Sequence, residues 1–491
     1  MDVVSPTIFF LDATRKTGLQ SQIRETTVSA IVSGTILPGA RMPSSRKLAE
    51  YLKISRLTVT LAYQELVSQG YLEVRSRSAY YVAKTPPVTR PDKLLAYPSG
   101  SAIDWSSKLH SGFNIAKAIR KPHDWRRYRY PFLYGKMDHN LFDHAAWRDC
   151  ARRALAREDF ILMADDFAAA DDEELVNYIC TRTLPSRGIH ARPDEILVTV
   201  GAQNALWIVS HLLLNRNSHV VYENPGHPDI SATLHLTGAR MTALDVDDGG
   251  LPPERLPEGI DAVFVTPSHQ SPTAATMPIE RRKALLEAAD RQDFIIVEDD
   301  YEFEMSFLEP PMPALKSLDQ NGRVLYVGSF SKSLFPGLRL GFLVAPAPVI
   351  HEARALRALM LRHPPGHLQR TTAYFLALGH YDTVLHRMRI EYHKRHIAMI
   401  DALNREGVRI AGKSAFGGTS FWIEGPEGMD ADQLARELRE DGVLIESGAP
   451  FFLNREGPCR YFRIAYSSIP LVRIAEGIEI IARRIRQHFG G

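Results

Sequence analysis

Short apolar runs alternate with helical segments through most of this chain, and this alternation constrains the fold more than any other feature. Each run has the length of a buried strand, and the segments between the runs have the apolar spacing of helices. Strands separated by helices predict a mostly parallel sheet with helices on both faces, a doubly wound α/β domain. The runs are EILVTV, HVVYENP, AVFVTPS, FIIVEDD, VLYVGSF and LGFLVAP.

The pattern changes beyond Pro348, where the chain becomes mostly helical. Two late runs, FGGTSFWIEG and RYFRIAY, have the alternation of strands. We therefore expect a small C-terminal α+β subdomain to follow the doubly wound sheet.

The first 84 residues predict a separate unit. Residues 19–33 have helical apolar spacing, and the segments SRKLAEYLKI and SRLTVTLAYQELVSQGYL predict two short helices joined by a tight turn. Such a pair is typical of helix-turn-helix proteins, and the alternating segment YLEVRSRSAYYVA predicts a hairpin, or wing, behind it. Residues 85–108 contain four prolines and no clear period, which predicts a linker to a domain over residues 109–491.

Charge is nearly balanced over the whole chain but not over this first unit. Lys plus Arg is 59 against 57 Asp plus Glu, a formal net charge of +2, so any nucleic-acid site must be local. A small helical domain with a solvated surface could carry the same charges, but two helices and a wing favour DNA binding, because phosphate contacts require a local basic face. The clustered basic residues are Arg41, Arg46, Lys47, Lys53, Arg56, Arg75 and Arg77.

Composition excludes several other classes of protein. A chain of 491 residues that is 45% hydrophobic can bury a large core. Cys150, Cys180 and Cys459 are scattered, which fits neither a disulfide framework nor a metal site and is typical of a reducing cytoplasm. The longest apolar run, LWIVSHLLL, is far shorter than the roughly 20 residues of a membrane span, so we expect a cytoplasmic protein without one.

A lysine stands between two apolar runs in VLYVGSFSKSLFPGLRLGFLVAP. Lys332 directly follows a predicted strand, as do Asp299, Tyr301 and Gly201, and ligands of doubly wound sheets bind at such strand ends. Desolvation makes a lysine amine nucleophilic and suited to a Schiff base with a carbonyl. A Ser-x-Ser-Lys segment alone indicates no more than a surface lysine, so the other strand ends carry the argument.

An aldehyde cofactor with a phosphate group would account for those neighbours. Arg339, Ser329 and Ser331 could ligate the phosphate, and the glycine of VGAQNAL opens a helix whose N–H groups form an anion site. A carboxylate at Asp299 would keep a pyridine ring protonated and electron-withdrawing. These residues therefore predict a cofactor with an aldehyde, a phosphate and a pyridine ring, the groups of pyridoxal 5'-phosphate. The sequence has no metal-binding motif such as HExxH or CxxC, so we expect no metal.

Several of these motifs resemble a known family. SFSKSLFPGLRLGF, VEDDYEFE, VTVGAQNAL and YENPGHP resemble the fold-type I pyridoxal phosphate proteins of the aspartate aminotransferase superfamily. MPSSRKLAEYLKISRLTVTLAYQELVSQGYL resembles the winged helix of GntR-type regulators. Both, in this order, resemble the MocR/GabR family of transcription regulators over nearly all of the chain.

The resemblance implies a function and leaves two alternatives open. It implies a homodimer that binds double-stranded operator DNA and senses an amine effector, an amino acid or an amino sulfonate, as an external aldimine. A working aminotransferase with an attached DNA-binding module is one alternative, and a regulator that senses pyridoxal phosphate itself is another.

The resemblance also implies a role for each matching residue. Lys332 would form the internal aldimine, Asp299 would pair with the pyridine nitrogen, and Tyr301 would bind the phenolic oxygen. Arg463 in YFRIAYSS would grip an effector carboxylate, although an arginine in a late strand could also be structural. The phosphate would be held by Arg339, Ser329, Ser331, Gly201, Ala202 and Gln203, and the operator would be contacted by Arg46, Ser55, Arg56, Thr58 and Thr60.

Three positions depart from the family pattern. His227 replaces a tyrosine that stacks on the cofactor, and it could stack, titrate or be a satisfied loop histidine. Ser271 in SPTA replaces an asparagine that touches the phenolic oxygen, which argues against efficient transamination. A GABA-responsive member of the family has a carboxylate-binding arginine at the position of Asp229. An acidic residue here predicts a different effector, and we expect Asp229 to contact it.

Overall fold

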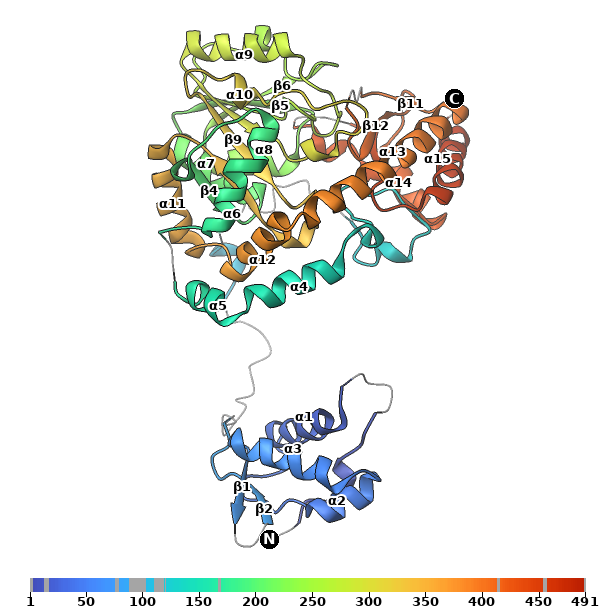
Figure 1. The fold of residues 1–491 in the computed structure, drawn as a ribbon. Helices are drawn as coiled ribbons and strands as arrows, with labels where there is room; N and C mark the ends of the chain where they lie inside the picture. Colours follow the sequence, from blue (N-terminus) through green and yellow to red (C-terminus); the bar gives the residue numbers. More distant parts are fainter. Residues whose placement is uncertain are drawn as a thin grey trace. The chain divides into compact units, whose positions relative to one another are not determined.

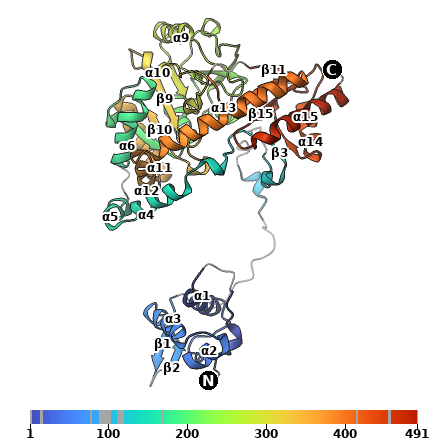
Figure 2. The same ribbon diagram turned by 45° about the vertical axis from the view of Figure 1, so that its right-hand side comes forward.

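The computed structural model describes residues 3–12, 17–75, 79–87, 103–109, 119, 121–166, 169–412, 416–453 and 457–489. The chain forms two compact units, Met1–Leu109 and His110–Gly491, drawn in Figures 1 and 2. Each unit has its own hydrophobic core. Most of the predicted linker, residues 88–102, lies outside the described residues.

The smaller unit is a winged helix-turn-helix, as predicted. Ser44 and Ser55 cap its second and third helices, because their hydroxyls accept hydrogen bonds from the backbone N–H groups of Lys47 and Leu57, each at 3.2 Å. The tip of the wing, with Arg77, lies outside the described residues. The elements are α1 (Leu19–Val32), α2 (Ser45–Leu52), α3 (Arg56–Ser68), β1 (Leu72–Arg75) and β2 (Ala79–Val82), with β1 and β2 antiparallel.

One face of α3 forms the centre of this small core. Val59, Ala62, Tyr63 and Leu66 recur at helical spacing and are fully buried. The hydroxyl of Tyr63 donates a hydrogen bond of 3.2 Å to the backbone oxygen of Pro43, just before α2. This packing fixes the rotation of α3, so its opposite face points away from the core.

The larger unit is built on a seven-stranded sheet in the order β4-β10-β9-β8-β7-β5-β6. Strand β10 is antiparallel to both neighbours and the other pairs are parallel, so the predicted mostly parallel sheet is confirmed. Only β6, a half-buried edge strand, was absent from the predicted strands. The strands are β4 (Ile196–Thr199), β5 (His219–Asn224), β6 (Arg240–Asp245), β7 (Ala262–Val265), β8 (Ile295–Asp299), β9 (Val324–Ser329) and β10 (Gly341–Val344).

Helices cover both faces of this sheet (Figure 1). The side chains of α7 (Ala202–Leu213), α8 (Pro228–Leu236) and α11 (Ala347–Leu361) pack in one core with residues of one face of the sheet. On the other face, α9 (Ile279–Gln292) packs over residues of β7 and β8. Both faces of the central strands are therefore buried, which explains their nearly continuous apolar runs.

The C-terminal subdomain has the predicted α+β character (Figure 2). Its sheet has the order β11-β12-β15-β14, and the 27-residue helix α13 leads into it. The elements are α12 (Gly366–Ala377), α13 (His380–Glu406), β11 (Arg409–Ile410), β12 (Ser420–Glu424), α14 (Ala431–Glu440), β14 (Glu446–Ser447), β15 (Tyr461–Ala465) and α15 (Ile474–Phe489).

The sequence analysis predicted no helices or strands for the segment before the large sheet. A parallel pair, β3 (Tyr130–Pro131) with β13 (Val443–Leu444), attaches it to the C-terminal subdomain. Three helices precede β4 and a short helix precedes β9: α4 (His144–Ala154), α5 (Arg157–Ala164), α6 (Glu173–Tyr178) and α10 (Leu315–Leu318).

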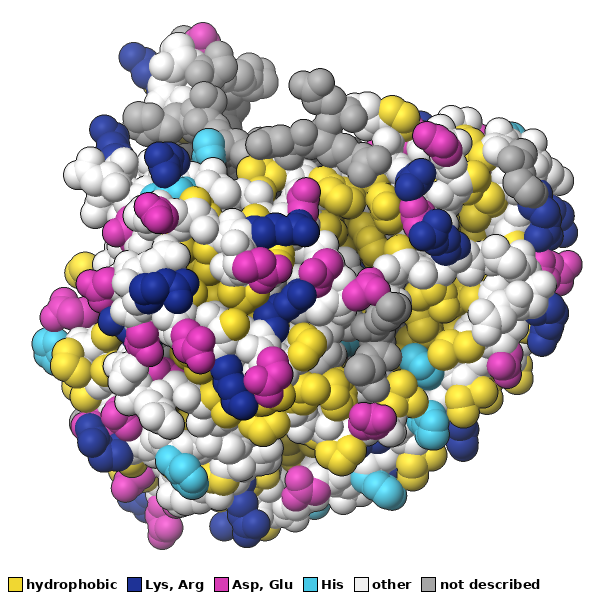
Figure 3. Space-filling view, turned by 90° about the horizontal axis from the view of Figure 1, so that it is seen from above, with side chains coloured by type: hydrophobic (Ala, Val, Ile, Leu, Met, Phe, Trp, Pro, Cys, Tyr) yellow, Lys and Arg dark blue, Asp and Glu magenta, His cyan; other side chains and the backbone are white. Residues whose placement is uncertain are grey.

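Surface charge of the larger unit is mixed. On the face in Figure 3, Lys and Arg side chains alternate with Asp and Glu, as the near-neutral composition leads one to expect. Within the described ranges, we find no helix with the length and apolar composition of a bilayer crossing. The same ranges contain no group of His, Cys, Asp and Glu side chains arranged to hold a metal ion.

Candidate functional site

A cavity of about 260 Å³ lies where several strands of the large sheet end. The loops after β5, β7, β8 and β9 and the first turns of α7 and α8 contribute its walls. Ten of the residues that the sequence predicted line this one cavity: Lys332, Asp299, Tyr301, Arg339, Ser329, Ser331, Ala202, Gln203, His227 and Asp229.

Lys332 follows β9 and points toward an aromatic ring. Its Nζ lies 4.1 Å from the ring centroid of Tyr134. Gly135 has a φ of +66°, and a Cβ there would lie 2.9 Å from the lysine Nζ, so glycine lets the backbone come close to the amine. Burial lowers the pKa of Lys332 to about 8, which favours the neutral, nucleophilic amine.

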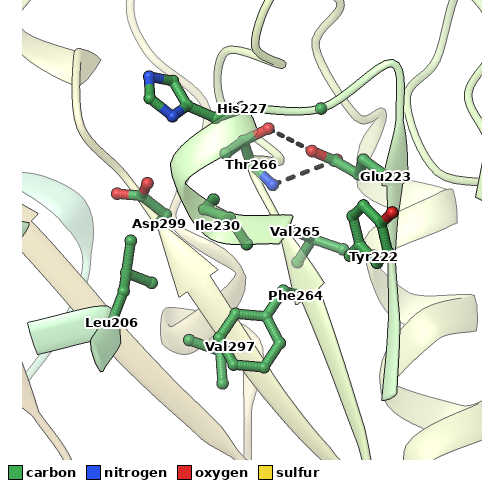
Figure 4. A pocket seen from close by; sticks show the side chains of 11 residues that line it. Leu206, Tyr222, Glu223, His227, Ile230, Phe264, Val265, Thr266, Val297 and Asp299 are labelled. Carbon is green, nitrogen blue, oxygen red and sulfur yellow. Dashed lines mark hydrogen bonds between the residues drawn. The ribbon is translucent and has the colours of Figure 1, made fainter. Parts of the chain in front are cut away.

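Asp299 ends β8 with a buried carboxyl group. Its Oδ1 has no hydrogen-bond partner among the described residues. Burial, with help from the carboxylates of Asp300 and Glu223, raises the pKa of Asp299 to about 7. In Figure 4 this carboxyl group and the His227 ring line the same small hollow, and dashed lines join Thr266 to Glu223. A buried carboxyl without a partner is costly, so the site suits a ligand that brings a proton donor.

The N-terminus of α7 and Arg339 form an anion subsite. Gly201 caps α7 with a φ of +77°, and a Cβ there would lie 3.0 Å from Nη2 of Arg339. The first N–H groups of α7 have no acceptor within the helix. Ser329 Oγ accepts a hydrogen bond of 3.2 Å from the Ser331 N–H, and Ser331 Oγ is buried without a partner in the described structure. The guanidinium cation, the backbone N–H groups and the serine hydroxyls together form a site that suits a phosphate group.

His227 and Asp229 contact each other at the start of α8. The Nδ1 of His227 accepts a hydrogen bond of 3.3 Å from the Asp229 backbone N–H, so the ring proton of the neutral form is on Nε2. Burial lowers the pKa of His227 to about 4, which keeps the ring neutral near pH 7. Of the alternatives for this residue, the lowered pKa therefore favours stacking or a satisfied loop position over titration near neutral pH. The Asp229 carboxylate lies 3.9 Å from the ring and is half-exposed.

Arg463 is close to the cavity but does not line it. Its guanidinium carbon lies 4.1 Å from the ring centroid of Tyr134, the same ring that Lys332 contacts. Its Nε donates a hydrogen bond of 2.7 Å to Glu446, whose second oxygen pairs with Lys121 at 2.9 Å. Its Nη2 is buried without a partner among the described residues. The Tyr134 ring therefore contacts both the arginine and Lys332.

Sequence reasoning missed Tyr134, Lys121 and Glu446. The one local signal is the glycine that follows an aromatic residue in YPFLYG. Burial opposes ionisation of Glu446, but Arg463 and Lys121 outweigh it and lower the pKa of that carboxyl. Because these residues come from distant segments, only the folded chain brings them together.

The fold and this site define a class, namely proteins that carry a pyridoxal phosphate-type aminotransferase domain behind a DNA-binding winged helix. The family model described as aminotransferase class I and II matches residues 148–481, and that of bacterial regulatory proteins, gntR family, matches residues 19–82. The chain belongs to the MocR/GabR family of GntR-type transcription regulators.

Individual relatives agree with this. The HTH-type transcriptional regulator TauR of Rhodobacter capsulatus is 50% identical over 97% of this chain and 99% of its own length. The probable rhizopine catabolism regulatory protein MocR of Rhizobium meliloti is 32% identical over 78% of this chain and 77% of its own. The crystal structure of LysN, an alpha-aminoadipate aminotransferase of Thermus thermophilus, has a TM-score of 0.70 and 28% identity over 78% of this chain and 99% of its own.

Proposed function

We propose that this transcription regulator binds pyridoxal phosphate in the cavity around Lys332 and uses it to sense an amine effector. The observation that carries the proposal is the convergence of three features on one cavity. These are a lysine amine of lowered pKa, an unpartnered buried carboxyl at Asp299 and an anion subsite at Arg339. They match the amine, the ring nitrogen and the phosphate that such a cofactor requires.

When bound, pyridoxal phosphate supplies an aldehyde that condenses reversibly with primary amines. Lys332 would be the resident amine that holds this carbon. Asp299 would pair with the ring nitrogen. Tyr301, whose pKa burial raises well above its usual value, keeps its proton and would donate a hydrogen bond to the phenolic oxygen. The neutral ring of His227 would contact the cofactor ring. The phosphate would be held by Arg339, Ser329, Ser331 and the N–H groups after Gly201, at Ala202 and Gln203.

A primary amine on the effector would bind beside Lys332, where it could reach the same carbon. An acid group on the effector, a carboxylate or a sulfonate, would pair with Nη2 of Arg463, which makes no hydrogen bond among the described residues. Asp229 at the exposed rim would accept a second donor group. We therefore propose an amino acid or an amino sulfonate as the effector class.

The DNA-binding half would act through two copies of the chain. In each copy, residues 1–84 would bind one operator half-site and residues 109–491 would sense the effector. Residues 85–108 would link these two domains. A two-fold dimer matches paired half-sites on DNA. Arg46 and Arg56 are exposed, whereas the hydroxyls of Ser55 and Thr60 already make hydrogen bonds inside α3, and Thr58 is half-buried.

Transamination is a second candidate, because Lys332, Asp299 and Tyr301 all line the cavity that an aminotransferase would use. Ser271 also lines it, where the family's enzymes place an asparagine. A serine there would give the phenolic oxygen one contact fewer than an asparagine, which favours sensing over turnover.

Absorbance spectroscopy with amines separates these functions. The cofactor-loaded protein should change its absorbance when a responsive amine is added and should bind operator DNA differently in a mobility-shift titration. Lys332→Ala should lose the absorbance of lysine-linked cofactor and its trapping by borohydride, while Lys283→Ala, at an exposed position of α9, should keep both. Steady conversion of a keto acid would favour the enzyme instead, and a Lys332→Ala protein that still traps cofactor would contradict the site.

A further inference from the structure

The outward face of α3 carries two exposed leucines. Leu57 is 64% exposed and Leu61 is 41% exposed. They are four residues apart, on the side of the helix opposite the buried Val59 and Leu66. The core of the smaller unit therefore does not explain these side chains.

The surroundings of the two leucines are basic. Arg56 immediately precedes Leu57 and lies 3.4 Å from Ser45 at the start of α2, so the two helices share one surface. On that surface Arg46, Lys47 and Lys53 are exposed. A cationic rim around a small apolar centre complements the DNA major groove, where phosphates lie at the edges and base edges at the floor.

The position of Leu57 is fixed rigidly. Ser55 accepts a hydrogen bond from the Leu57 N–H at 3.2 Å, which locks the first turn of α3. The helix α3 is the second of the two helices in the helix-turn-helix, and in such units the N-terminal residues of that helix reach the base edges. The apolar group that base pairs present in the major groove is the C5-methyl of thymine.

We propose that Leu57 reads a thymine methyl group in each operator half-site, with Leu61 packing against the neighbouring step. Apolar contact would then supply sequence specificity at a position where no hydrogen bond is made. The proposal rests on the winged helix and its basic rim and is independent of the effector site.

Replacement of thymine by deoxyuridine tests this directly, because it removes the methyl and keeps every base-edge hydrogen-bonding group. The preferred duplex is first selected from a random library with the full-length protein, and each dT is then changed singly to dU. For the parent, a single dU should weaken binding about fourfold, the value of one buried methyl, and dU in both half-sites about sixteenfold. Leu57→Ala, which changes the contact in both half-sites, should bind the thymine duplex about sixteenfold more weakly and should not respond to that dU.

Two controls distinguish base reading from a structural effect. Leu37→Ala changes an equally exposed leucine outside α3, at 66% exposure, and should leave both affinity and dU response unchanged. Leu57→Ala should also keep the parent's dependence of affinity on salt, since no phosphate contact is lost. A parent that tolerates dU at every position, or a Leu57→Ala protein that responds to dU as the parent does, would overturn the proposal.

Discussion

At the residue scale, the larger unit contains buried polar atoms that make no hydrogen bond to other described residues. Asp299 Oδ1, Ser331 Oγ and Arg463 Nη2 are buried without hydrogen bonds among the described residues. Folded proteins rarely leave such groups unpaired. The three atoms lie where the proposed ring nitrogen, phosphate and acid group would bind, so each gives a separate test of the site.

The raised pKa of Asp299 predicts a pH dependence of the cofactor-free protein. Between its unfolded pKa of 3.8 and its folded value of about 7, the folded state keeps a proton that the unfolded state has lost, so stability falls as pH rises. Asp299→Asn removes this pH dependence, because the amide group does not titrate. Urea unfolding at pH 8 should show the variant more stable than the parent by on the order of 1–3 kcal/mol. At pH 4 the two should agree, and an equal difference at both pH values would contradict the assignment.

Arg463 predicts a preference for amines that carry an acid group. The loaded parent should bind β-alanine more tightly than propylamine, as measured by the change in cofactor absorbance. Arg463→Met should abolish this preference by raising the dissociation constant for β-alanine well over tenfold, because losing one partner of a buried charge pair costs roughly 2–5 kcal/mol.

That substitution also leaves Glu446 with Lys121 as its remaining charged partner. The double variant Arg463→Met and Glu446→Gln is therefore the matched control, since it removes both charges of the broken pair. It should load cofactor normally and still fail to distinguish the two amines. Undiminished preference for β-alanine in both variants would rule out the arginine clamp.

At the element scale, the turn from β4 into α7 forms the anion subsite. Gly201 takes a positive φ of +77° there, and Arg339 packs against it from the loop before β10. The backbone of the turn and the guanidinium group thus approach each other more closely than a side chain at this position would allow.

Gly201→Ala should therefore weaken cofactor binding. Its Cβ would lie 3.0 Å from the Arg339 guanidinium and displace it, whereas Gly379→Ala imposes the same φ of +77° with nothing within 4 Å. Both variants should lose about 1–2 kcal/mol of stability from backbone strain alone. In a titration with pyridoxal phosphate, only Gly201→Ala should show reduced affinity, and equal affinities would place the phosphate elsewhere.

At the scale of the whole molecule, α5 carries large apolar side chains that the hydrophobic cores leave exposed. Phe160, Ile161 and Leu162 are consecutive in this helix and all three are exposed. Monomeric proteins rarely leave several large apolar side chains exposed together. We infer that a second copy of the chain covers this surface.

Leu162→Asp should then dissociate the dimer. Analytical ultracentrifugation of the loaded parent at micromolar concentration should give about twice the chain mass of 55.1 kDa, and the variant should sediment as a monomer. Glu280→Lys, a charge change at an exposed position of α9, serves as a control and should leave the dimer intact. A parent that sediments as a monomer would contradict both the interface and the proposed pairing of operator half-sites.

The sequence by itself determined the elements and the motifs that lie within them. Apolar runs predicted six of the seven large-sheet strands, because strand periodicity is a local property of the chain. Family motifs also placed Lys332 and Asp299 at strand ends, where the fold brings them to one cavity.

Only the tertiary structure decided what surrounds those motifs. The pairing of Arg463 with Glu446, the third partner Lys121 and the Tyr134 ring that contacts both Arg463 and Lys332 join segments that no local pattern connects. The edge strand β6 escaped prediction because it is half-buried and its apolar alternation is weak. Such contacts depend on how distant segments pack and on the burial and charge that result, which periodicity along the chain does not encode.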